Sequence, residues 1–102
     1  MKTLYSNIAL LEMEALFENR KIYLKSGITP SLIADLLKIK RRRLEGIVNN
    51  SFGLSIDNIV NMYRLQYARQ LLISGEKYDS LWEKSGFSSR VDMERAFENI
   101  VV

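Results

Sequence analysis

The sequence contains neither cysteine nor histidine, and their absence narrows the classes of function open to the chain. Without cysteine there is no disulfide framework and no thiol nucleophile, a composition typical of proteins from a reducing compartment. Without histidine the chain lacks the commonest metal ligand and the commonest general base. We therefore expect no metal, no cofactor and no enzymatic activity, and we assign the scattered carboxylates to helix capping and solubility.

Long apolar runs and prolines are also scarce. No apolar run approaches the roughly 18 residues that a membrane-spanning helix requires, and the N-terminus lacks the pattern of a signal peptide. From these features we expect a cytoplasmic protein. The chain has one proline and no sustained polar–apolar alternation, which favours an all-α fold. Its 102 residues leave room for one domain and not for two independent cores.

Positive charge is concentrated in the middle of the chain. Residues 1–37 carry four cations and four anions, residues 38–75 carry seven cations and two anions, and residues 76–102 carry four cations and six anions. A local basic segment on a nearly neutral chain indicates a polyanionic partner at one place. A basic helix that is merely solvated would give the same count, so charge alone leaves both interpretations open.

The first half of the sequence predicts three helices. Helical spacing of apolar residues places the first helix over residues 6–18. Its expected inner face consists of Ile8, Leu11, Ala15 and either Leu16 or Phe17. Thr29 followed by Pro30 is a typical helix start, because the hydroxyl can cap free amides and proline fits the first helical position. A tight turn at Lys38-Ile39 then leads into a third helix over residues 40–52.

The longest predicted helix covers residues 56–73, with Ser55 as its expected N-cap. Its apolar residues form two offset stripes, so we expect burial on two sides. A central core helix of one globule would show this pattern, and so would a rod shared between two small subdomains. Two further helices are expected, one over residues 79–84 and one from residue 89 to the end.

The segments on either side of the long helix repeat one another. Both "ITPSLIADLLKIKRRRL" and "KYDSLWEKSGFSSRVDM" run from a cap through a short apolar helix and a tight turn into a second helix. Ala34 corresponds to Trp82 and Ile39 to Phe87, in each case 48 residues later. Each half is therefore predicted to be a helix-turn-helix unit.

The chain resembles the DNA-binding domain of the AraC/XylS family of transcription regulators. The stretches that carry the resemblance are "SLIADLLKI", "LEGIVNNSFG", "YRLQYARQLL" and "GFSSRVDMERAF", within roughly residues 10–98. The resemblance implies an all-α fold of two helix-turn-helix units bridged by a long linker helix, with the second helix of each unit in the major groove of double-stranded DNA. Because the chain ends at "ENIVV", we expect the family's final short helix to be lacking.

The resemblance also implies a division of the chain. We expect a single DNA-binding domain over residues 1–102. Its expected parts are an N-terminal helix and lead-in at 1–27, a first helix-turn-helix at 28–53, the linker helix at 55–74, and a second helix-turn-helix at 77–102.

The second helix of each unit supplies the expected DNA contacts. The expected buried sides are Leu44, Ile47 and Val48 in the first unit, and Met93, Ala96, Phe97 and Ile100 in the second. We assign base reading to Arg42, Glu45, Asn49, Arg90, Val91 and Arg95. We assign phosphate contacts to Lys38, Lys40, Arg41, Arg43, Asn50 and Ser89. Arginine pairs with guanine, asparagine with adenine, and valine contacts the thymine methyl group.

Departures from the family pattern gather in the second half. Trp82 stands where the family has a small residue, so we expect different packing or a partly exposed ring. Ser85 occupies a normally apolar position. The second reading helix also carries three carboxylates, those of Asp92, Glu94 and Glu98. An alternative therefore stays open, a protein-interaction module that binds another regulator or RNA polymerase without reading DNA. A sensor domain or sensor protein is a further expected partner.

Overall fold

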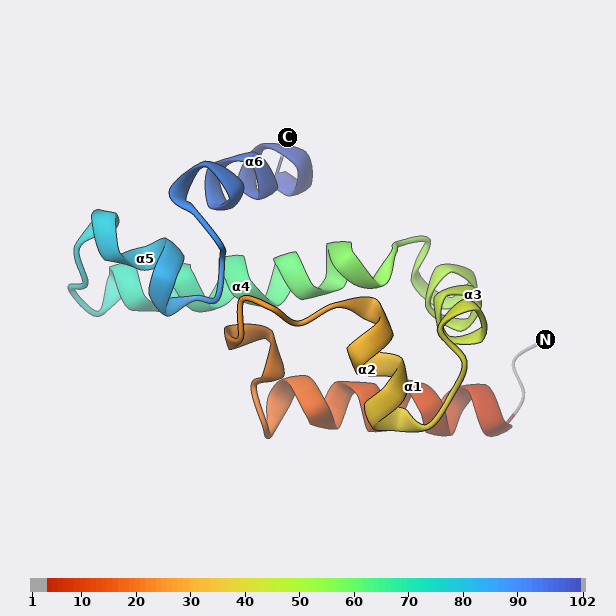
Figure 1. Cartoon of the computed structure of the whole chain (residues 1–102). Helices are drawn as coiled ribbons and strands as arrows, with labels where there is room; N and C mark the ends of the chain where they lie inside the picture. The colour runs from red at the N-terminus through yellow and green to blue at the C-terminus, as the bar shows by residue number, and fades with distance from the viewer. Residues whose placement is uncertain (1–3, 102) are drawn as a thin grey trace. The chain divides into compact units, whose positions relative to one another are not determined.

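In the computed structural model, residues 4–101 are described, and their fold is helical throughout (Figure 1). The helices are α1 (Leu4–Glu18), the 3₁₀ turn η1 (Ile22–Leu24), α2 (Pro30–Leu37), α3 (Arg41–Phe52), α4 (Ile56–Ile73), α5 (Tyr78–Lys84) and α6 (Arg90–Val101). The expected all-α class is confirmed. Within this part of the chain, none of the helices has both the length and the hydropathy needed to cross a membrane.

The described chain divides into two compact units. The first holds residues 4–22 and 28–57, and the second holds residues 23–27 and 58–101. The second unit therefore includes a short segment that lies between α1 and α2 in the sequence. Helix α4 begins in the first unit and continues through the second.

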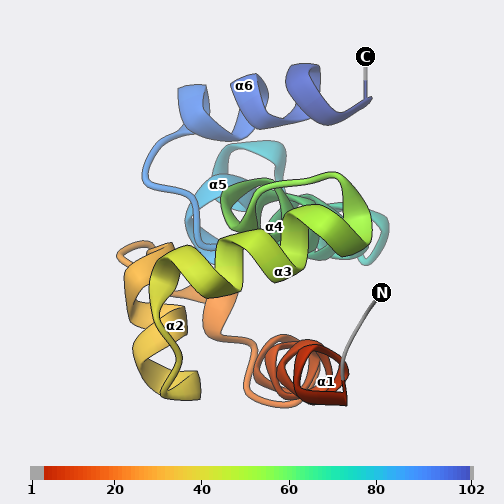
Figure 2. The same cartoon turned by 90° about the vertical axis from the view of Figure 1, so that its right-hand side faces the viewer.

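In the first unit, α1 buries a different face from the expected one. Ile8 and Leu11 are exposed, as is Ala15, so the prediction of the inner face is wrong for these three residues. The buried residues of α1 are Ala9, Met13, Leu16 and Phe17. Helix α1 is apolar on two sides, and periodicity alone cannot choose between them. Figure 2 shows α1 nearly end-on, with α2 and α3 gathered on one side of it.

Helix α2 begins and ends as the sequence predicts. The Thr29 hydroxyl accepts a hydrogen bond from the Leu32 amide at 3.2 Å, and Pro30 is the first helical residue. The helix ends at Lys38, whose backbone is left-handed with φ 58° and ψ 42°. This conformation lets the Ile39 amide donate back to the Ala34 carbonyl at 3.1 Å. The tight turn between the two helices is thereby confirmed.

The same turn recurs 48 residues later in the second unit. The Phe87 amide donates to the Trp82 carbonyl at 2.9 Å, in the place of the bond between Ile39 and Ala34. Gly86 takes the place of Lys38 and also has a positive φ, 94°. The predicted repeat is confirmed in the turns. It shifts by one residue at the second helix, since α3 begins at Arg41 and α6 at Arg90.

The core of the second unit is a small cluster formed by α4, α5, α6 and the turn before α6. Its buried members are Ala68, Leu81, Phe87, Met93 and Ala96, with Leu65, Leu71 and Trp82 packed against them. Trp82 is half-buried, which agrees with the expected partly exposed ring. Ser85 is fully buried, and its hydroxyl donates a hydrogen bond to the Leu81 carbonyl at 2.6 Å. The buried polar group is therefore satisfied.

Phe97 is not part of this core. Its side chain is 52% exposed, so the prediction that it lies on the buried side of α6 is wrong. It lines a shallow groove with Tyr78, Met93, Glu94 and Glu98. The residues that α6 contributes to the buried cluster are Met93 and Ala96. The side chain of Ile100, also expected on the inner face, lies outside the described residues.

A buried arginine fastens residues 23–27 to α4. Arg64 is 8% exposed; its Nε donates to the Tyr23 carbonyl at 2.6 Å and its Nη2 to the Lys25 carbonyl at 2.8 Å. The guanidinium carbon lies 5.6 Å from the centre of the Phe87 ring. The Tyr23 ring packs on Tyr63 of the same helix, with 5.4 Å between ring centres. One side chain thus holds two backbone carbonyls of a segment remote in sequence.

Candidate nucleic-acid interface

Helix α3 has the two-sided character that a groove-binding helix requires. Leu44, Ile47 and Val48 are buried, as the sequence predicts. Arg42 and Asn49 are exposed, and so is Gly46, where a Cβ atom would meet nothing within 4 Å. The helix therefore buries its apolar stripe and leaves an unobstructed polar face.

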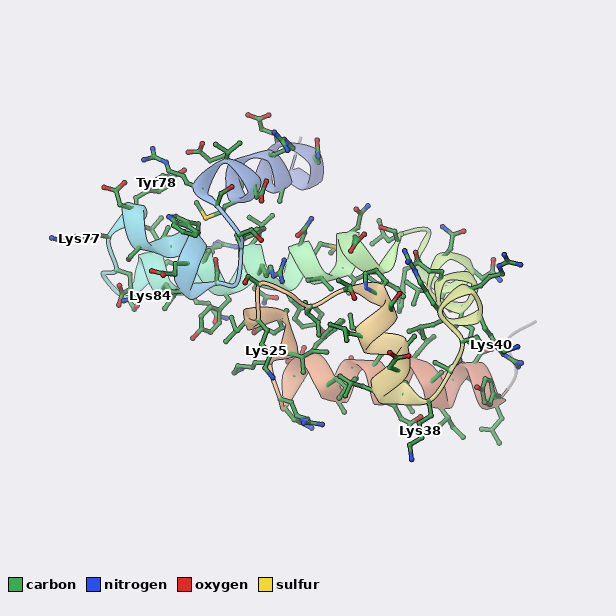
Figure 3. All side chains as sticks on the ribbon, viewed as in Figure 1. Lys25, Lys38, Lys40, Lys77, Tyr78 and Lys84 are labelled. Atoms are coloured by element: carbon green, nitrogen blue, oxygen red, sulfur yellow. The ribbon has the colours of Figure 1, made fainter. Side chains whose placement is uncertain are left out.

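The N-terminus of α3 is surrounded by cations and lacks a side-chain cap. Lys40 is the N-cap residue and makes no capping hydrogen bond through its side chain. Figure 3 shows Lys38 and Lys40 extending outward at this end, and Arg41 begins the helix. The first amides of a helix lack intrahelical partners and carry a partial positive charge. This end of α3 therefore suits an anion such as a phosphate.

Two arginines that flank this face make contacts within the first unit. Arg41 Nη1 donates to the Ser31 hydroxyl at 3.4 Å. The guanidinium carbon of Arg43 lies 4.4 Å from the centre of the Tyr5 ring. Both contacts are at the surface, where they orient the side chains and leave other guanidinium donors available. Arg42, between them in sequence, is exposed.

Glu45 makes a contact that the sequence does not predict. This half-buried side chain accepts a hydrogen bond from the Ile56 amide through Oε1 at 2.9 Å, so it caps the start of α4. Reading a base would require this bond to break. No local motif indicates the contact, because its two residues are 11 positions apart.

The N-terminus of α6 differs from that of α3, because one of its free backbone amides is hydrogen-bonded by a capping side chain. The Ser89 hydroxyl accepts from the Asp92 amide at 3.0 Å, a local cap. Val91 is 58% exposed, and the Arg95 guanidinium lies 3.8 Å from the Asp92 carboxylate. Asp92 also places a negative charge in the first turn. The α6 N-terminus is thus less favourable for an anion than the α3 N-terminus.

Arg90, the first residue of α6, is held by carboxylates. Its Nη1 lies 3.2 Å from the Asp79 carboxylate and its Nε 3.2 Å from that of Glu94. The hydroxyl group of Tyr78 (Figure 3) donates a hydrogen bond to the same Glu94 carboxylate at 2.7 Å. The Tyr78 hydroxyl and Arg90 lower the pKa of Glu94, and the bond to Glu94 raises the pKa of Tyr78.

The expected contact residues therefore fall into two groups. Those at the start of α3 leave cationic groups exposed at an uncapped helix end, whereas both arginines of α6 lie beside carboxylates. Ser89 and Glu45 are engaged as caps. Asn50 is exposed near the end of α3. No sequence signal identified Tyr78, because its role depends on the approach of α5 to α6.

Carboxylates do not gather into a metal site within the described part of the chain. No three acidic side chains there are close enough together to hold a metal ion. Several carboxylates lie beside cations instead, as Glu76 lies 2.6 Å from the Lys84 ammonium group. That ammonium group lowers the pKa of Glu76.

Solved structures with this fold include two response-regulator C-terminal domains. The C-terminal domain of the two-component response regulator YesN from Fusobacterium nucleatum aligns with a TM-score of 0.71 and 18% identity, over 95% of this chain and 95% of that one. The C-terminal domain of AraT, a response regulator from Geobacillus stearothermophilus, aligns with a TM-score of 0.75 and 19% identity, over 98% of this chain and 79% of that one. No protein-family model and no curated protein matches the sequence. The likenesses confirm the fold that the resemblance to the AraC/XylS domain predicted.

Proposed function

We propose that this chain regulates transcription by binding double-stranded DNA through α3. The chain shares its fold with the C-terminal domains of two response regulators. The observation that carries the proposal is the form of α3. Its apolar stripe is buried, its polar face is exposed, and cations surround its uncapped N-terminus. An α-helix fits the major groove, and a helix N-terminus ringed by cations suits the phosphates beside it.

Within this proposal the residues of the first unit have distinct roles. Arg42 and Asn49 read base edges from the exposed face. Four cations at the start of the helix contact phosphates and supply affinity that does not depend on sequence: Lys38, Lys40, Arg41 and Arg43. Asn50 adds a further phosphate contact at the far end. Glu45 reads a base only where the α4 cap is released.

The second unit has a smaller role in the proposal. Arg90 and Arg95 are assigned to bases, but each would first leave a carboxylate partner. Val91 is exposed enough to touch a thymine methyl group. We therefore expect α6 to add less affinity than α3.

Binding to duplex DNA should fall steeply with salt. If four cations neutralise four phosphates, the log–log slope is about −3.6, or about 150-fold weaker binding when salt rises from roughly 50 to 200 mM. Fluorescence anisotropy of a labelled random-sequence duplex measures both affinity and slope. Replacing Lys40 and Arg41 together by alanine should reduce the slope by about 1.8, because two phosphate contacts are lost.

A matched control removes the same charge elsewhere. The double variant Arg20→Ala and Lys21→Ala takes two exposed cations from the segment that follows α1 and should change the slope much less. Equal losses from both double variants would indicate a general charge effect and would contradict the assignment to α3. Absence of binding at low salt would contradict the proposal as a whole.

Substitution of Arg42 and substitution of Arg41 should weaken DNA binding in different ways. Arg42→Ala removes an exposed donor from the reading face, so we expect base preference to relax at one position, with a cost of about 1–3 kcal/mol on the preferred duplex. Arg41→Ala should weaken binding to all duplexes alike. Selection of bound fragments from a random duplex library measures both effects. The reverse pattern would contradict the roles assigned.

One observation favours a second function. The groove lined by Tyr78, Met93 and Phe97 has two carboxylates beside it, from Glu94 and Glu98. Such a surface suits an apolar side chain flanked by cations, as on another regulator, a sensor protein or RNA polymerase. If Phe97→Ser left duplex binding unchanged but abolished binding to such a protein, the second unit would serve protein contact.

A further inference from the structure

The guanidinium of Arg90, at the start of α6, is held by groups from two helices of the second unit. From α5, the Asp79 carboxylate lies 3.2 Å from Nη1, and the centre of the Tyr78 ring lies 4.9 Å from the guanidinium carbon. From α6, the Glu94 carboxylate lies 3.2 Å from Nε. Two anions and one aromatic face therefore surround this cation.

Glu94 is itself oriented by α5. The Tyr78 hydroxyl donates a hydrogen bond at 2.7 Å to the same carboxylate oxygen that faces Arg90. Glu94 is also half-buried, which limits the positions its side chain can take. An isolated ion pair at a surface contributes little, but several charges joined in a network hold one another more firmly. The four side chains form such a network.

The network engages the donors that base reading requires. Pairing with guanine uses two neighbouring donors of the planar guanidinium. Arg90 offers two such pairs, Nε with Nη2 and Nη1 with Nη2. Because Nε faces Glu94 and Nη1 faces Asp79, each pair already has one donor beside a carboxylate. A base that takes either pair of donors therefore competes with a carboxylate.

The charge around Arg90 also differs from the charge at the start of α3. There, Arg41 meets the Ser31 hydroxyl and Arg43 lies over the Tyr5 ring, and these neutral partners do not cancel a positive charge. At α6, two carboxylates face one guanidinium, so the network is net negative. A negative site repels an approaching phosphate.

We propose that Asp79 and Glu94 limit the DNA affinity of the second unit by holding Arg90, so that α6 is a latent DNA reader. This role rests on the proposed function, because it presupposes that the chain binds duplex DNA. Neither carboxylate contacts DNA in this role, and each acts through Arg90 as a positioning residue. Once the carboxylates are neutral, Arg90 can turn to a guanine or a phosphate.

Neutralising both carboxylates should strengthen DNA binding. The double variant Asp79→Asn and Glu94→Gln keeps the size of both side chains and removes their charge. Since an exposed ion pair shifts an equilibrium by up to about fivefold, we expect about 3–10-fold tighter binding to a labelled random-sequence duplex at roughly 100 mM salt. The log–log salt slope should steepen by about 0.9, because Arg90 adds one phosphate contact. Fluorescence anisotropy of the full chain measures both quantities.

Two further proteins separate the effect of Arg90 from a general effect of charge. Glu83→Gln with Glu98→Gln removes one exposed carboxylate from each of the same two helices, and should tighten binding by less than about twofold with little change in slope. Adding Arg90→Ala to the Asp79→Asn and Glu94→Gln pair should return the affinity to within about twofold of the unmodified chain, because the gain depends on Arg90.

The outcomes distinguish this role from the proposed function. A gain no larger than that of the Glu83 and Glu98 control, or one that survives Arg90→Ala, would overturn the role of Asp79 and Glu94 and leave α3 as the DNA-binding helix. Binding by the double variant but not by the unmodified chain would support the latent reader and contradict the proposed function of α3. Absence of binding by both proteins at low salt would overturn both. Circular dichroism confirms that each variant is folded.

Discussion

Arg64→Met is expected to lower the free energy of unfolding by about 3 kcal/mol. Methionine keeps the apolar stem but removes two charge-assisted hydrogen bonds, each worth about 1.5–3 kcal/mol. It also leaves the Tyr23 carbonyl without the donor that lies 2.6 Å from it. For a domain of this size the loss corresponds to a fall in Tm of roughly 10–20 °C, measurable by thermal denaturation followed by circular dichroism.

Two further variants sharpen this expectation. Arg69→Met makes the same change at an exposed arginine of α4 and should shift stability by no more than about 0.5 kcal/mol. Arg64→Lys keeps the charge but not the planar fork that reaches both Tyr23 and Lys25, so its loss should be intermediate. If Arg64→Met were as stable as Arg69→Met, the guanidinium would not hold residues 23–27.

Gly86→Ala is expected to cost at least about 3 kcal/mol of stability. A Cβ atom on Gly86 would lie 2.8 Å from the Leu24 Cα atom and closer still to the Tyr23 carbonyl oxygen. These are backbone atoms, which cannot rotate away as the end of a flexible side chain does. The positive φ of 94° adds strain, because residues with a side chain rarely adopt it. Urea denaturation measures the loss as a lower midpoint.

Gly75 provides the matched control for steric overlap. Its φ is also positive, 105°, but an added Cβ would meet nothing within 4 Å. Gly75→Ala therefore isolates the backbone strain, which we expect to cost about 1–2 kcal/mol. Equal losses at the two glycines would show that the approach of Tyr23 and Leu24 contributes nothing.

Features determined by neighbouring residues were predictable from the sequence. Thr29 caps α2 by accepting a hydrogen bond from the amide three residues later in the sequence. The turns at Lys38 and Gly86 belong to a pattern that repeats after 48 residues. The buried stripe of α3 follows from helical spacing alone. These features depend on short-range geometry, which the sequence records directly.

The face that a helix buries was less predictable. Helix α1 has apolar residues on opposite sides, so spacing alone did not separate Ile8 and Leu11 from Met13 and Leu16. The choice depends on what packs against the helix, which is a tertiary property. The prediction for Phe97 was wrong for the same reason. Its position on the helix predicts burial, but the buried cluster of the second unit does not include it.

Contacts between side chains and distant backbone were not predictable at all. Glu45 caps a helix that starts 11 residues later, and Arg64 binds carbonyls about 40 positions away. Both residues look like surface charges in the sequence. The DNA-contact assignments remain predictions, because they describe a partner that geometry within one chain does not contain.

The placement of residues 23–27 limits how this architecture can be divided or recombined. The two helix-turn-helix units have matching turns, which suggests interchangeable modules. Yet a fragment that begins at residue 58 would carry Arg64 without the carbonyls it binds and Gly86 without the backbone it approaches. Neither a cut at the start of α4 nor a transplant of residues 58–101 alone would deliver a complete folding unit. A graft of the second unit must also carry residues 23–27, which in the sequence lie between the two helices α1 and α2 of the first unit.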